Sequence, residues 1–171
     1  MLVSTRGRYA LRVLIDLAEN GQAENGETVR IPLMDIAARQ AISEKYLEII
    51  LSVLVRGGFL SGLRGKGGGY QLTRPPQDYT VASVLSLVED TIAPIACLSN
   101  EINPCERAVE CRTLPMWQGL DRIIHEYLEG ITIADLSKPE LSVTASGKPL
   151  CSGPAGAGDM RMPKPSGKPK E

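Results

Sequence analysis

Residues 36–72, IAARQAISEKYLEIILSVLVRGGFLSGLRGKGGGYQL, carry the clearest structural signal of the sequence. This stretch begins inside a short helical pattern over 33–40 and continues, after the three-residue break AIS, into a longer pattern that ends at Gly57 and Gly58. Ser43 is placed to cap the longer helix, whose apolar stripe consists of Leu47, Ile50, Leu51 and Leu54. Short helix, tight turn and longer helix together predict a helix-turn-helix.

The rest of the stretch predicts a β-hairpin. Two apolar segments near 59–63 and 70–73 flank a glycine-rich tip. A hairpin directly after a helix-turn-helix is a wing, so we expect a mainly α fold with a small β-hairpin. GKGGG could also suggest a nucleotide site, but phosphate-binding loops lead into a helix and this one leads into a strand.

Further helices are expected on both sides. Residues 5–20 predict a helix with one apolar face, which Ser4 or Thr5 can cap. TVRI is a candidate short strand before Pro32. Thr80 caps another helix, and Thr132 and Asp135 have capping-box spacing before a last short one. Pro115 opens a long helix to about 129, with an aligned seam of Trp117, Leu120, Ile124, Tyr127 and Leu128.

Three parts follow from these patterns. Residues 1–79 form the winged helix-turn-helix domain, and 80–137 hold a helix, a cysteine-containing loop and the long helix. Residues 138–171 lack an apolar period and are rich in Pro and Gly, so we expect a disordered tail there.

Charge and composition restrict the function classes. Residues 1–74 carry ten basic and seven acidic side chains, whereas 75–140 carry four and eleven, so the front half is the part suited to a polyanion. No apolar run reaches membrane-spanning length and the first twenty residues lack a signal-peptide core, which predicts a cytoplasmic protein. One histidine and no nucleophile–base pair argue against an enzyme.

The second helix of a helix-turn-helix places its first turns in the major groove of DNA. Here those turns carry Lys45, Tyr46 and Glu48; Lys45 can donate to guanine or phosphate, and Glu48 can accept from a cytosine amine. Arg64 and Lys66 at the wing tip, with Arg6 and Arg8 at the first helix, can contact phosphates. These seven residues are the candidate DNA contacts.

Three of the four cysteines fall in CLSNEINPCERAVEC, residues 97–111. In a reducing compartment, clustered cysteines more often bind metal or sense redox state than form structural disulfides. From the residues alone, the segment could bind a metal, act as a thiol redox switch or have no sensing role.

STRGRYALRVLIDLA, the helix-turn-helix block and RGKGGGYQL resemble the IscR-like regulators of the Rrf2 superfamily, over residues 1–137. The resemblance implies a transcription regulator, typically a repressor, that forms a homodimer through its long helix. Two-fold symmetry in turn implies a partly palindromic operator. The resemblance also implies an iron–sulfur cluster on Cys97, Cys105 and Cys111, of the 2Fe–2S type or alternatively 4Fe–4S. Through this cluster the protein would sense iron–sulfur, redox or nitric oxide status.

The fourth ligand is unassigned. Leu114 stands where the enterobacterial IscR type has a histidine. Some relatives instead use an acid near the start of the first helix, from the partner chain, and here that stretch, RGRYALR, has none. His125, three glutamates of the loop (101, 106 and 110) and Cys151 are the remaining donors. Alternatives are a thiol switch, another metal such as zinc, a loop without a sensing role, or a cysteine-metabolism-type repressor of the same fold without a cluster. A protein-interaction module is the alternative from a different class.

Overall fold

A computed structural model describes residues 3–22, 28–65, 67–100 and 103–138. The expected tail from 139 onward, Cys151, Glu101 and Lys66 lie outside these ranges. The helices and strands run in the order α1 Thr5–Asn20, α2 Leu33–Gln40, α3 Glu44–Arg56, β1 Leu60–Leu63, β2 Gly69–Leu72, α4 Val81–Val88, α5 Leu114–Glu129 and α6 Ile133–Leu136. Short 3-10 turns lie at Pro76–Asp78, Ala96–Leu98 and Ala108–Glu110.

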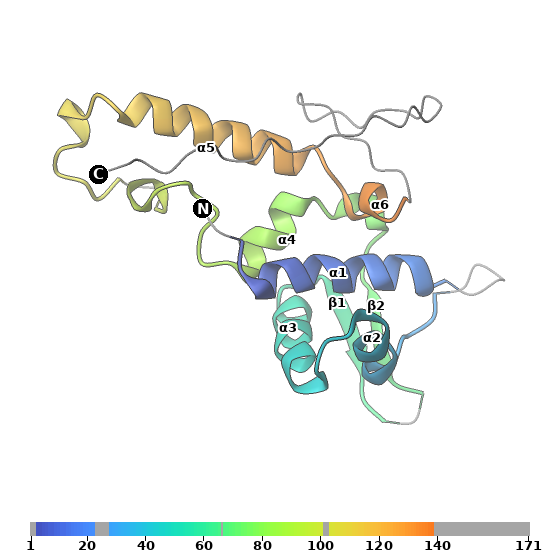
Figure 1. Cartoon of the computed structure of the whole chain (residues 1–171). Helices are drawn as coiled ribbons and strands as arrows, with labels where there is room; N and C mark the ends of the chain where they lie inside the picture. Colours follow the sequence, from blue (N-terminus) through green and yellow to red (C-terminus); the bar gives the residue numbers. More distant parts are fainter. Residues whose placement is uncertain (1–2, 23–27, 66, 101–102, 139–171) are drawn as a thin grey trace, which may run out of the picture.

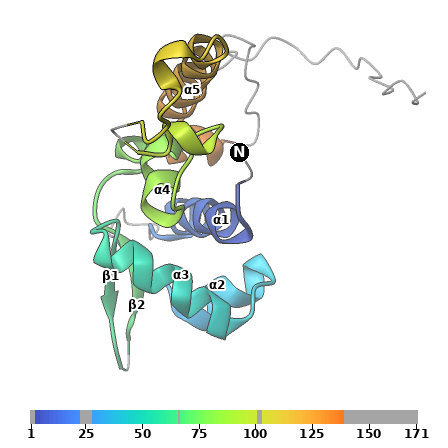
Figure 2. The same ribbon diagram turned by 90° about the vertical axis from the view of Figure 1, so that its left-hand side faces the viewer.

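The elements form layers (Figure 1). The block of α2, α3 and the β1–β2 hairpin lies on one side of α1, while α4 and α5 lie on the other, as the turned view also shows (Figure 2). Helix α1 packs against α2, α3, β2, α4 and α6, so it is the centre of the fold. The main core is made of aliphatic side chains from α1, α2, α3, α4 and α6, including Leu14, Ile36, Leu47, Leu54, Val84 and Ile133.

The start of α1 is fixed by two capping contacts. The Ser4 hydroxyl accepts a hydrogen bond from Gly7 N, as expected for an N-cap. Ser4 N and Ser4 Oγ both donate to Glu89 Oε1, at 3.0 and 2.8 Å. Because Glu89 follows directly on α4, this carboxylate ties the first turn of α1 to the point where the cysteine-containing connection begins.

The turn between α2 and α3 uses an unusual residue. Ala41 adopts the left-handed conformation (φ 53°, ψ 44°), and its N–H closes the end of α2. Ser43 is the N-cap residue of α3, as expected, although its side chain makes no capping hydrogen bond. The backbone carbonyl of Ser43 still accepts the first hydrogen bond of the helix, from Leu47 N at 2.9 Å.

The hairpin is antiparallel, with Leu60 paired to Leu72 and Leu63 to Gly69. Gly69 has φ 152°, and a Cβ there would meet the backbone of Ile31, so only glycine fits. Ile31 and Tyr70 exchange both main-chain hydrogen bonds at 2.9 Å. TVRI therefore supplies isolated bridges at Thr28 and Ile31 rather than the short strand expected.

The caps predicted for the two later helices, α4 and α6, are confirmed. Thr80 accepts from Ser83 N at the start of α4, and Thr132 and Asp135 form the capping box of α6. A second, smaller apolar cluster of Val81, Leu85, Ile92 and Ile131 joins α4 to the end of α5.

Helix α5 buries none of its sixteen residues in this protomer. The expected seam divides between two faces. Trp117, Ile124 and Leu128 are half-buried, whereas a separate stripe is exposed, made of Met116, Leu120, Ile123 and Tyr127. None of the described helices is long and apolar enough to cross a bilayer.

Candidate nucleic-acid interface and cysteine segment

The outer face of α3 carries the expected reading residues. Leu47, Ile50, Leu51 and Leu54 are completely buried, and this stripe turns Lys45 and Glu48 outward, where both are exposed. Tyr46 lies at the boundary: it is half-buried, and its ring packs edge-to-face on Tyr9 of α1, with ring centroids 5.9 Å apart. Lys45 and Glu48 are therefore free to contact a ligand, while part of Tyr46 is used for packing.

A groove of about 770 Å³ separates α3 from the wing. Glu48 lines it from the helix and Arg64 lines it from the end of β1, so two expected contacts meet at one concavity. Ser52 and Arg56 also line it, and Arg56 Nε donates to Ser52 O at 3.3 Å. These two residues were missed from sequence; their spacing of four and eight from Glu48 was the signal that placed them on the same face.

The other expected contacts lie apart from this groove. Arg6 is half-buried and Arg8 exposed on the first turns of α1, and neither is among the residues lining the groove. Arg8 is oriented locally, since its Nη2 donates to Thr5 Oγ1 at 3.1 Å. Lys66, at the wing tip, lies outside the described residues.

A buried carboxylate holds α2 against α1. Asp16 is 1% exposed and receives two hydrogen bonds from Arg39, at 2.8 and 2.7 Å, and one from Gln40 at 3.0 Å. The hydrogen bond to Asp16 raises the pKa of Arg39 above its ordinary value. Arg12 of α1 donates to the side chain and main chain of Gln40. Because these contacts join α1 to the end of α2, they fix the orientation of the helix-turn-helix.

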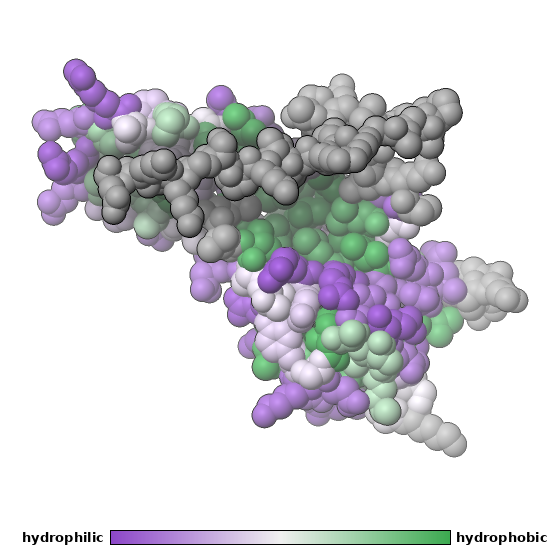
Figure 3. Space-filling model, in the orientation of Figure 1, coloured by the Kyte–Doolittle hydropathy of each residue, from purple (hydrophilic) through white to green (hydrophobic). Residues whose placement is uncertain are grey.

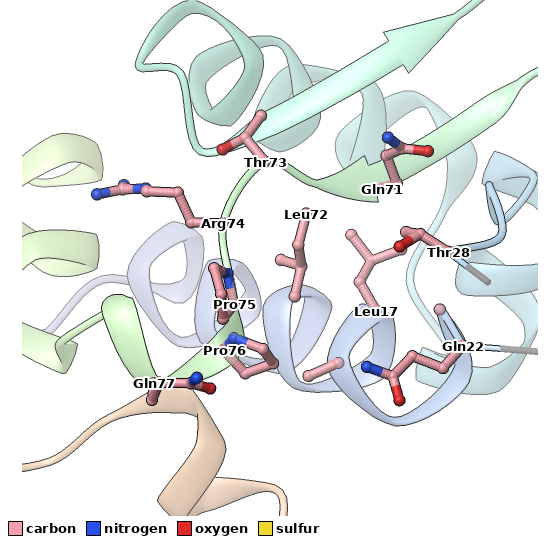
Figure 4. Close-up of a pocket in the computed structure, with 12 residues that line it drawn as sticks. Leu17, Gln22, Thr28, Gln71, Leu72, Thr73, Arg74, Pro75, Pro76 and Gln77 are labelled. Carbon is pink, nitrogen blue, oxygen red and sulfur yellow. The ribbon is translucent and has the colours of Figure 1, made fainter. Parts of the chain in front are cut away.

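A second cavity, of about 420 Å³, lies between the end of α1 and the exit of the wing (Figure 4). Leu17, Gln22, Thr28 and Gln71 line it together with the chain after β2. The Arg74 guanidinium stacks on the rings of Tyr79 and Phe59, 4.7 and 5.0 Å from their centroids. Among the described residues that line this cavity there is no acid or histidine, so they offer no usual metal ligand of those types.

The cysteine segment connects α4 to α5 at one end of the molecule (Figure 1). Cys97 and Cys111 are half-buried and Cys105 is exposed. Among the residues that the structure describes, no group of three or more His, Cys, Asp or Glu side chains is gathered closely enough to hold a metal ion. The donor set is thus three free thiols of the type that iron–sulfur clusters use, not yet brought together in this protomer.

Two contacts bear on the chemistry of the segment. Cys111 Sγ lies 3.4 Å from Thr113 Oγ1, and hydrogen bonds from Thr113 lower the pKa of the Cys111 thiol. A lowered pKa favours the thiolate, which is both the metal-binding and the redox-reactive form. His125 stays within α5, its Nδ1 3.0 Å from Asp121 O, and Glu106 and Glu110 are exposed.

Comparison with known proteins agrees with this arrangement. Residues 3–139 match the Rrf2 family, described as iron-dependent transcriptional regulators. The protein rrf2 of Nitratidesulfovibrio vulgaris is 36% identical over 139 residues, which are 81% of this chain and 88% of that protein. The transcriptional regulator IscR of Aliivibrio salmonicida is 35% identical over 136 residues, 80% of this chain and 77% of that protein.

Solved structures show the same fold. T. potens IscR superposes with a TM-score of 0.60 at 32% identity, covering 80% of this chain and 85% of that one. CymR, the global cysteine regulator of B. subtilis, superposes with a TM-score of 0.59 at 28% identity, covering 80% and 96%. The winged-helix expectation and the resemblance to IscR-like proteins are therefore confirmed. The chain belongs to the Rrf2 family of transcriptional regulators, a family of regulators rather than of enzymes.

Proposed function

We propose that this regulator binds a specific, partly palindromic DNA operator as a homodimer in the cytoplasm and senses iron–sulfur, redox or nitric oxide status through a cluster. The observation that carries the DNA part is the groove between α3 and the wing. Glu48 faces it from the reading helix and Arg64 from the wing, so one concavity presents an acceptor for bases and a donor for phosphate or a groove edge. Lys45, Tyr46, Arg6, Arg8 and Lys66 complete the proposed contacts.

Helix α5 supports the homodimer. Met116, Leu120, Ile123 and Tyr127 are spaced by four, three and four residues, the pattern of a helix–helix seam, and are 37–59% exposed. Figure 3 shows further hydrophobic surface between α5 and the block around α1. A second copy would cover this apolar surface and place two reading helices on successive half-sites.

Cys97, Cys105 and Cys111 are the proposed cluster ligands. They lie on one connection, none is in a disulfide, and the lowered pKa of Cys111 favours the thiolate that iron requires. Because the three are not gathered in the protomer, the segment would have to close around its metal. Bound there, a cluster supplies a centre that oxidants and nitric oxide can alter. The fourth ligand stays unassigned, and a 2Fe–2S cluster is proposed ahead of 4Fe–4S.

The DNA proposal is tested with a selected duplex. The full-length protein is used to enrich binders from a random library, and affinity is then measured against salt. We expect log Kd to rise linearly with log salt concentration and Arg64→Ala to weaken binding by about tenfold or more. Arg122→Ala, an exposed arginine of α5, is the matched control. Enrichment of no sequence at all would overturn the proposal.

The cluster proposal is tested by anaerobic reconstitution with iron and sulfide. We expect visible absorption and bound iron in the wild type and loss of both in Cys97→Ser, Cys105→Ser and Cys111→Ser. Ser52→Ala, at an exposed residue of α3, is the control and should keep its colour. Loss of colour in Cys151→Ser would identify Cys151 as the fourth ligand. Colourless, iron-free wild type would contradict the cluster and leave the thiol switch or a cluster-free repressor.

A further inference from the structure

Two apolar side chains are exposed on α3, Ile49 and Val55, and Ile49 is the more exposed of them. Ile49 is 51% exposed, although it sits in the middle of a helix that buries four other aliphatic residues completely. Lys45, Ile49, Ser52 and Arg56 follow the spacing i, i+4, i+7, i+11, so they form the line directly opposite the buried stripe. Ile49 is the apolar member of that outermost line.

No packing contact in the described part of the protomer accounts for the position of Ile49. It is absent from the buried core and from the partly buried residues packed against it, unlike Tyr46 and Val53 on the same helix. Helix propensity does not explain Ile49 either, because a β-branched residue is a weaker helix former than the Lys, Glu or Ala common on helix surfaces.

The residues around Ile49 are of types that suit contact with DNA. Lys45 precedes Ile49 by one turn, Arg56 follows by two, and Glu48 is adjacent, so a small apolar surface is framed by groups suited to phosphates and base edges. In the major groove the apolar feature that distinguishes a base pair is the C5 methyl group of thymine. A half-exposed isoleucine between two cations matches that chemistry.

We propose that Ile49 is a specificity-determining residue that contacts a thymine methyl group in each half-site of the operator. The inference rests on the proposed DNA-binding function and deepens it. It predicts that the preferred half-site contains a thymine whose methyl group contributes to affinity through Ile49. Burial of one methyl group is worth about 0.8 kcal/mol, which corresponds to an about fourfold change in Kd.

The test is a deoxyuridine scan of the duplex selected by the wild-type protein. Each thymine is replaced singly by deoxyuridine, which removes the methyl group and leaves base pairing intact. For the wild type we expect an about fourfold loss at one thymine per half-site and little change elsewhere. Ile49→Ala should bind the unmodified duplex about fourfold more weakly and be insensitive to that replacement, whereas Ile49→Val should keep the sensitivity.

Val29→Ala, which shortens a 40%-exposed apolar side chain outside α3, is the matched control and should retain the wild-type scan. Methyl sensitivity at no thymine, or equal sensitivity in wild type and Ile49→Ala, overturns the role of Ile49 while leaving DNA binding intact. Failure of the wild type to enrich any duplex overturns both the role of Ile49 and the proposed function. Urea unfolding of Ile49→Ala separates a binding defect from a folding defect.

Discussion

Helices α1 and α5 are both sixteen residues long, yet they lie in opposite environments. Helix α1 buries six residues, including a fully enclosed Asp16, and contacts every layer of the fold. Helix α5 buries none, although its apolar residues recur with the same helical regularity. The difference is one of partners: the neighbours of α1 are supplied by its own chain, whereas no residue in the described part of the chain buries the exposed stripe of α5.

Stability is distributed unevenly between these two regions. The free energy of folding comes mainly from the core around α1, α2 and α3, because that is where aliphatic area is removed from water. The connection carrying the cysteines and the exposed stripe of α5 contribute little by themselves. A change in either can therefore alter function without unfolding the reading half.

The sharpest test of this contrast is a core truncation. Leu47→Ala removes a fully buried side chain of α3 and should lower the free energy of unfolding by about 3 kcal/mol. Ile49→Ala, two residues away on the exposed face, should change it by less than about 0.5 kcal/mol. Urea unfolding followed by circular dichroism measures both. Equal losses in the two variants would show that α3 is not packed as described.

The exposed stripe of α5 provides the converse test. Ile123→Glu places a charge in the middle of the stripe and should weaken the proposed dimer by at least about tenfold, since a desolvated charge opposes association. Sedimentation measures the dimer and circular dichroism the fold of the monomer. Gln118→Glu, on another exposed face of α5, is the control. A variant that remains dimeric would remove this stripe from the interface.

A smaller effect is expected in the reading half, at the turn between α2 and α3. Ala41→Gly relieves a left-handed conformation and should raise the free energy of unfolding by about 1 kcal/mol. Ala38→Gly, in the exposed helical part of α2, should lower it by about the same amount. Opposite signs in urea unfolding confirm that the turn keeps this geometry, and equal signs would contradict it.

The smallest effect is a pH dependence at α6. The hydrogen bond from the Thr132 side chain, with help from Lys138, lowers the pKa of Asp135 below its ordinary value. The native state therefore favours the carboxylate: its contribution, about 0.5 kcal/mol for this partly exposed group, is present above the unfolded pKa and is lost as pH falls through the folded value. Asp135→Asn should be less stable than wild type at pH 7 and equal to it at pH 2.5. A gap that persists in acid would point to packing instead.

The local elements could be predicted because their signals are local. Helix α1 begins after Ser4 and α6 after Thr132, where hydroxyl caps are written into neighbouring residues, and the wing follows from its glycines. The missing Ser43 hydrogen bond could not be predicted, since a backbone can reach the N-cap conformation without using its side chain.

Contacts between residues far apart in the chain could not be predicted from the sequence. The bond from Ser4 to Glu89 spans 85 positions, and no pattern near either residue reveals it. The split of α5 into two faces depends on where α4 docks, which periodicity alone does not give. For the site, Glu48 and Arg64 were identified by type and motif, whereas the groove that unites them required the fold. The assignment of DNA contacts and cluster ligands, and the boundary at 79/80, stay predictions.

The hydroxyl of Tyr79 lies at the base of the wing, in a side chain with no exposed surface. It accepts from Thr73 N and Arg74 N, at 3.0 and 2.8 Å, and donates to Phe59 O at 2.9 Å. In hydrogen–deuterium exchange, the Thr73 and Arg74 amides should consequently be among the slowest of the hairpin region, opening only with the core beneath them. The wing is in that sense anchored at its root.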